Sequence, residues 1–260
     1  MPRINMILAF RFRSSTERAS ILLETMDFDA LFLGFPENLG ESLNLYRLGI
    51  ISEEELWNDY ICMTGLSDPF ANSLRYRLEP LIKKLPLIGH DHDFDIYGFE
   101  DFQYHIRLRG FAEQQLLLEF KSRATGKINP DEWRALLREE LETTKLLEEK
   151  IVNNLQEKGA KHNNSVFICA GLVNNIKRKL SPIFDVKVIC LERYWKSPLE
   201  VLKTLFILKG FDNIPDDTVK LCIKQHLKYL DYILLYDNID TAHEAWVREL
   251  KPYMIQKRLD

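Results

Sequence analysis

The chain has 260 residues, of which 46% are hydrophobic and 28% are charged, and its formal net charge is −4. This composition is that of a folded globular protein and excludes an intrinsically disordered chain. The negative charge argues against nucleic-acid binding through bulk charge, although the basic triplet Lys177-Arg178-Lys179 leaves a local site of that kind open.

The amino-terminal apolar run, residues 4–12, resembles a leader peptide only superficially. It is short, and Arg11 and Arg13 take the place of the small residues of a cleavage site, so we interpret it as a buried strand. No stretch approaches the roughly 20 apolar residues that span a bilayer. We therefore expect a cytoplasmic protein with reduced cysteines, in which Cys169 and Cys190 are buried because both lie in apolar runs.

Hydrophobic spacing predicts two strand–helix–strand units. The first consists of a strand at 4–12, a helix at 16–26 and a strand at 30–35. The second consists of a strand at 165–170, a helix at 172–180 and a strand at 186–191. Each unit implies a parallel pair of strands with a right-handed crossover.

The middle of the chain is mainly helical. Ser52 and Glu55 form the pattern of a capping box and start one helix. Further helices are predicted at 70–84, 108–123 and 129–157, with one strand at 95–99. We expect an α/β domain over residues 1–197, with a mostly parallel sheet flanked by helices and helical insertions at about 40–90 and 105–158.

The tail, residues 198–260, is predicted to contain helices at 198–210, 216–235 and 241–250. The second helix is apolar around much of its circumference, so we expect it to be buried on more than one side. The tail should therefore pack on the same domain or form an interface between copies of the chain.

Ligands of a parallel sheet bind beyond the carboxyl ends of its strands. The residues that follow the predicted strands there are polar, and guanidinium groups can bind a carboxylate or phosphate ligand. The candidate ligand-binding residues are Arg11, Arg13, Asn174 and Arg193, and the candidate catalytic carboxylates are Glu37, Glu100 and Asp101.

The stretch His90-Asp91-His92 is a candidate metal site, because histidine binds transition metals and carboxylate binds harder ions. On an extended segment His90 and His92 would point to one side. A polar turn with solvated histidines is the alternative.

The order of elements resembles the superfamily of TraB/PrgY-like, ChaN-like and erythromycin-esterase-like proteins. The resemblance is carried by residues 6–12, 31–37, 96–101 and 166–174, and it implies the same fold. The family has GxxH after its first strand, Glu at the end of its second and GxxH after a late strand. Here Phe12 and Asn174 stand where His is expected, and Gly34, with Glu37 close by, stands at the second position.

Two functions follow from these observations. The first is a non-catalytic or regulatory protein that binds a small anionic ligand or a protein segment at the strand ends, since Phe12 and Asn174 bind metal poorly. The alternative is a hydrolase in which Glu37, Glu100 and Asp101 hold a divalent ion and its bound water is the nucleophile. The sequence names no other cofactor.

Overall fold

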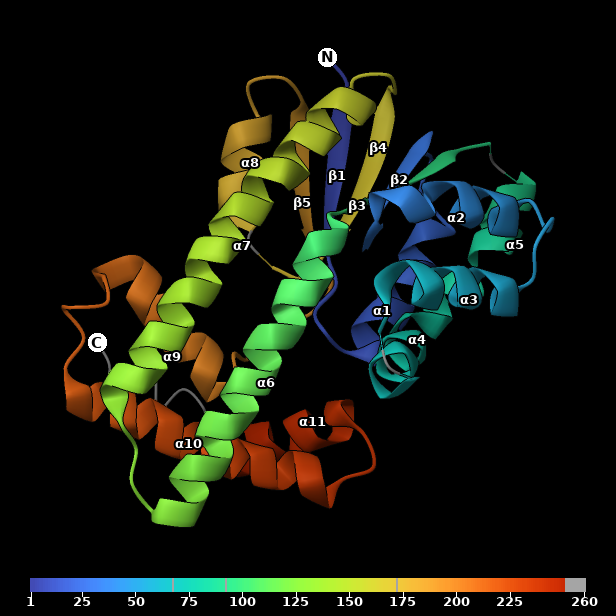
Figure 1. Cartoon of the computed structure of the whole chain (residues 1–260). Helices are drawn as coiled ribbons and strands as arrows, with labels where there is room; N and C mark the ends of the chain where they lie inside the picture. Colours follow the sequence, from blue (N-terminus) through green and yellow to red (C-terminus); the bar gives the residue numbers. More distant parts are fainter. Residues whose placement is uncertain (67, 92, 172, 251–260) are drawn as a thin grey trace. The chain divides into compact units, whose positions relative to one another are not determined.

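A sheet of five parallel strands forms the centre of the computed structural model, which describes residues 1–66, 68–91, 93–171 and 173–250 (Figure 1). The strand order is β3-β2-β4-β1-β5. The strands are β1 (Arg3–Leu8), β2 (Ala30–Pro36), β3 (Asp95–Glu100), β4 (Asn164–Cys169) and β5 (Asp185–Cys190). The predicted α/β class with a mostly parallel sheet is confirmed.

In both strand–helix–strand units, another strand of the sheet lies between the two strands that the helix connects. β4 lies between β1 and β2, and β1 lies between β4 and β5. The prediction that each unit forms a directly hydrogen-bonded pair is therefore wrong. Local hydrophobic spacing identifies a strand, but the choice of its partner depends on contacts between segments more than 100 residues apart.

Helices make up most of the remaining chain. The capping box is confirmed, because Ser52 Oγ accepts a hydrogen bond from the Glu55 N–H while the Glu55 carboxylate accepts one from the Ser52 N–H. The helices at 37–47 and 85–91 were not predicted individually, although both overlap the helical insertion expected at about 40–90. The helices are α1 (Arg13–Leu23), η1 (Glu37–Leu39), α2 (Gly40–Arg47), α3 (Glu53–Thr64), α4 (Asp68–Ile82), α5 (Leu85–Asp91), α6 (Phe102–Thr125), α7 (Pro130–Gly159), α8 (Val173–Leu180), α9 (Pro198–Lys209), α10 (Asp216–Leu235) and α11 (Ile239–Leu250).

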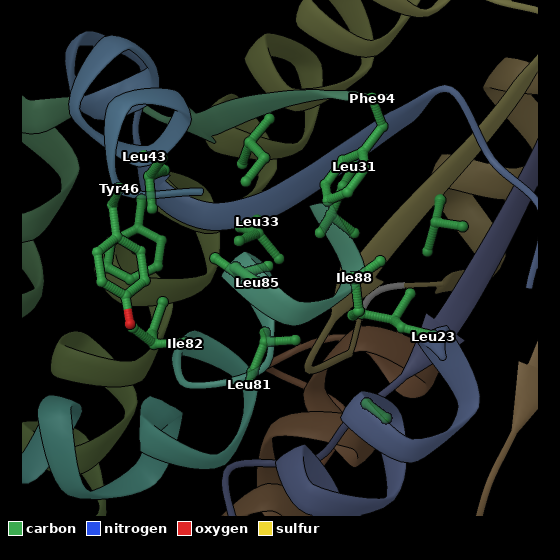
Figure 2. Close-up of a cluster of buried hydrophobic side chains, with 14 of the residues drawn as sticks. Leu23, Leu31, Leu33, Leu43, Tyr46, Leu81, Ile82, Leu85, Ile88 and Phe94 are labelled. Atoms are coloured by element: carbon green, nitrogen blue, oxygen red, sulfur yellow. The ribbon is translucent and has the colours of Figure 1, made fainter. Parts of the chain in front are cut away.

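The sheet is apolar on both faces, because alternate residues of each strand enter different cores. On one face, Leu31 and Leu33 of β2 belong to a core with side chains from α1 to α5. Figure 2 shows those from α1, α2, α4 and α5. On the other face, Phe32 of β2 packs with residues 147–155 of α7 and with α8. Helices cover both faces of the sheet as a result (Figure 1).

One edge of the sheet is closed by a side chain. Asn44 of α2 donates a hydrogen bond to the Ile96 carbonyl (2.8 Å) and accepts one from the Ile96 N–H (2.9 Å), as a neighbouring strand would. The opposite edge is β5, which pairs only with β1 among the described residues. Cys190 on β5 is consequently exposed, so the prediction that it is buried is wrong, whereas Cys169 is buried as expected.

A register shift near the end of β2 returns the chain to the β3 edge of the sheet, which Asn44 closes. The pairing of β2 with β3 shifts between Leu33 and Pro36, which brings the Pro36 carbonyl over Gly98. A Cβ at position 98 would lie 2.1 Å from that oxygen, so only glycine fits there. η1 and α2 then follow along β3, where Asn44 meets Ile96.

Contacts divide the chain into two compact units, residues 1–106 with 145–193 and residues 107–144 with 194–260. In the second unit, Trp133, Leu137 and Leu141 of α7 are buried against apolar side chains of α9 and α10.

α10 is buried over its first part, but Leu234 and Leu235 near its end are 79% and 78% exposed. Its buried residues, Val219, Cys222, Ile223, His226 and Tyr229, recur at helical spacing on one stripe, so the expectation that α10 is buried on more than one side is wrong. None of the helices in the described chain is both long enough and apolar enough to cross a bilayer.

Deleting residues 198–260 should give an insoluble or molten protein. The deletion uncovers Trp133, Leu137 and Leu141, which are at most 9% exposed in the intact chain. Near-ultraviolet circular dichroism and dye binding would measure the loss of packing. A 1–197 chain that is soluble, monomeric and cooperatively folded would contradict this expectation.

Asn44→Ala should lower the free energy of unfolding by about 1–3 kcal/mol, because it leaves the Ile96 N–H and carbonyl without a partner. Asn58→Ala, at an exposed position of α3, is the matched control and should change stability little. Urea denaturation followed by fluorescence would measure both. Equal effects of the two substitutions would show that Asn44 does not close the edge.

Candidate functional site

Near the carboxyl ends of the strands, Arg77 lies within electrostatic range of a second arginine, Arg11. Arg11 is exposed in the turn that follows β1, and Arg77 is half-buried on α4. Burial lowers the pKa of Arg77, and the positive charge of Arg11 lowers it further. The negative charge of Glu100, at the end of β3, opposes both effects, as does Tyr60 of α3. Arg77 therefore lies within electrostatic range of the other three side chains.

Within the described chain, the two guanidinium groups have no bonded counterion. Among the residues that the structure describes, neither Arg11 nor Arg77 forms an ion pair or a side-chain hydrogen bond. Arg13 differs, because its guanidinium contacts the Glu79 carboxylate at 2.5 Å and lies over the ring of Tyr76. A partly desolvated charge without a partner is costly, so Arg77 marks a position where an anion would be stabilised.

Tyr60 provides a rigid neutral group beside these charges. Its side chain is only 1% exposed, and its ring packs edge-to-face on Phe35 and on Trp57, with centroids 5.8 Å and 5.7 Å away. Burial raises the pKa of Tyr60, and the charge of Glu100 raises it further. The phenol therefore keeps its proton at neutral pH.

The three predicted carboxylates have different surroundings, and among the described residues they do not form a group that could hold a metal ion. Glu37 pairs with Lys158 at 3.5 Å, whereas Asp101 pairs with Lys150. These lysines are eight residues apart on α7, which corresponds to roughly 12 Å along the helix. Glu100 lies close to Gly34, where a Cβ would be 3.3 Å from its Oε1 atom.

The remaining predicted residues fall at separate places. Arg13 holds α4 through Glu79, and Arg193 is exposed three residues beyond β5. Asn174 lies in the first turn of α8, and its side chain is not in the described part of the structure.

The predicted metal site is only partly within the described chain. His92 lies outside the described residues, and His90 lies in α5. The extended geometry expected for His90 is wrong. Residues 85–91 form the helix α5, whose Leu85 and Ile88 pack into the core. Within the described ranges, no group of three or more His, Cys, Asp or Glu side chains could hold a metal ion.

The end of β5 is tied to α1 rather than open to a ligand. The Glu192 carboxylate accepts hydrogen bonds from the buried Ser15 hydroxyl and from Arg18. Cys190 Sγ donates to the Glu192 carbonyl at 3.1 Å. This cluster therefore positions the start of α1, next to Arg11.

A buried acid was missed from the sequence. Glu148 of α7 is 5% exposed, and burial raises its pKa, although the Asn175 amide donates a hydrogen bond to it at 3.2 Å. Arg77 was missed as well. Each lies on an apolar stripe, Glu148 between Leu141 and Ile151 and Arg77 between Leu74 and Leu81, and a charge on such a stripe is the signal that could have found them.

Glu148→Gln should stabilise the protein at neutral pH relative to the parent chain. The folded state raises the pKa of Glu148, so its ionisation costs stability once the pH exceeds the ordinary value of the carboxyl. The benefit of the substitution should therefore be absent near about pH 3.5 and grow as the pH rises to about 7. Denaturation at several pH values would measure it. Glu149→Gln, at the exposed neighbouring position, should show no such gain, and a pH-independent effect of Glu148→Gln would contradict the argument.

Comparison of the chain with protein-family models, with curated proteins and with solved structures finds no match.

Proposed function

We propose that the chain binds a small anionic ligand at the carboxyl ends of its strands, with Arg77 and Arg11 as the cationic groups. The observation that carries this proposal is the half-buried Arg77, which faces the charge of Arg11 and has no bonded counterion among the described residues. An anion between the two groups would relieve their repulsion and replace the hydration that Arg77 has lost.

The neighbouring groups narrow the class of ligand. Guanidinium binds planar carboxylate or phosphate oxygens through paired hydrogen bonds. Glu100 adds a negative charge that would accept a hydrogen bond from a ligand hydroxyl or amine. A small hydroxylated or amino-substituted carboxylate or phosphate fits these groups best, and a half-buried arginine favours such a molecule over a protein segment.

This role is binding rather than catalysis. The alternative, a hydrolase that uses a divalent ion, requires Glu37, Glu100 and Asp101 to converge on one metal. Two of these carboxylates pair with separate lysines of α7, so no observation favours that alternative. The resemblance to the TraB-like superfamily remains an expectation based on the order of elements.

The test is calorimetry with inorganic phosphate on the intact chain. Arg77→Gln and Arg11→Gln should each weaken binding by roughly tenfold or more, because a hydrogen bond to a charged group contributes about 1.5–3 kcal/mol. Arg3→Gln is the matched control, since Arg3 is a partly exposed arginine at the amino end of the same sheet. Binding that is unchanged in both site variants, or reduced equally in Arg3→Gln, would reject the site.

The variant Arg13→Gln tests whether Arg13 holds α4 in place or binds the ligand itself. Because Arg13 holds α4 through Glu79, this variant should lower the melting temperature but keep measurable phosphate binding at temperatures where it is folded. Complete loss of binding in a folded Arg13→Gln protein would place the ligand on Arg13 instead.

A further inference from the structure

The second compact unit contains an open pocket of about 540 Å³. It is lined by the turn between α6 and α7, residues 126–128, and by the first turns of α10, from Asp217 to Lys224. Pockets that hold small molecules measure roughly 300–1,000 Å³, so the size suits a small ligand. None of these residues belongs to the strand-end site.

The pocket combines an apolar surface with a cationic rim. Ile128 and Leu221 provide the apolar surface, and Ile128 packs against the core of this unit. Lys220 and Lys224 are four residues apart on one face of α10, which separates them by roughly 6 Å along the axis. Lys127 approaches from the facing turn. Three lysines therefore line one opening.

The positive charge of this rim is poorly compensated. In the part of the chain that the structure describes, Lys127 and Lys224 form no ion pair. Lys220 lies 3.9 Å from Asp217, whose carboxylate is 98% exposed and is the single acid that lines the pocket. The neighbouring Asp216 is paired with Arg134 at 2.6 Å. Three lysines against one solvated carboxylate give the pocket a net positive charge.

We infer that this pocket binds a small organic dianion that carries an apolar group, such as a phosphate monoester. The ammonium groups would contact the charged oxygens, and Ile128 and Leu221 would contact the apolar part. Lysine side chains suit this role, because their point charges turn toward phosphate oxygens without a fixed geometry. Arg77 and Arg11 have no part in it, so the pocket would function whether or not the strand-end site binds ligand.

The test uses phenyl phosphate and the full chain, with both arginines changed to glutamine so that the strand-end site cannot contribute. Nuclear magnetic resonance would follow the Gly126 and Lys127 amides during a titration. Phenyl phosphate should shift these signals saturably and bind more tightly than inorganic phosphate, which lacks the apolar group. If the arginine double variant does not fold, the same titration in the parent chain reports on the same two amides.

Lys224→Glu should weaken phenyl phosphate binding by about tenfold or more, because it reverses one charge on the rim. Lys228→Glu is the matched control, since Lys228 is exposed on the same helix one turn further on and does not line the pocket. Both positions are exposed, so both variants should fold. Equal weakening by the two variants would show that binding depends only on general surface charge and would overturn the proposal. The absence of saturable shifts at Gly126 and Lys127 would overturn it as well.

Discussion

The requirement that a parallel sheet be covered on both faces governs the first compact unit. Leu31 enters one core and Phe32 the other, so helices must return to alternate sides of the sheet. The carboxyl ends of parallel strands also lie at the same end of the sheet, so the turns after β1, β3 and β5 lie near one another. The location of Arg11, Glu100 and Glu192 follows from this constraint rather than from any local motif.

The closed edge of the sheet depends on a few backbone groups. Because the Pro36 carbonyl occupies the space above Gly98, the chain turns back along β3 instead of continuing outward. Asn44 then supplies two hydrogen bonds, both to Ile96, of the kind that a sixth strand would have made. This protects the edge against pairing with another chain. It also leads the chain into α3 and α4, which carry Tyr60 and Arg77.

Both proposed sites share one physical feature, a group of cations with too few bonded carboxylates. The chain as a whole is acidic, with a net charge of −4, so its overall charge does not reveal them. Other charged side chains are paired, as Arg13 is with Glu79 and Lys150 is with Asp101. The distribution of partners, rather than the number of charges, distinguishes Arg77 and Lys224 from these residues.

The sequence by itself determined the fold class and the existence of most helices and strands. It also determined that polar residues follow the carboxyl ends of the strands. Those properties follow from hydrophobic period, capping and turn chemistry, which act over a few residues. It did not determine that β4 separates β1 from β2, nor that Glu37 and Asp101 pair with lysines while Arg77 has no such partner among the described residues. These outcomes depend on which segments distant in the chain lie side by side, and only the tertiary structure decides that, because charge pairing and burial act through space.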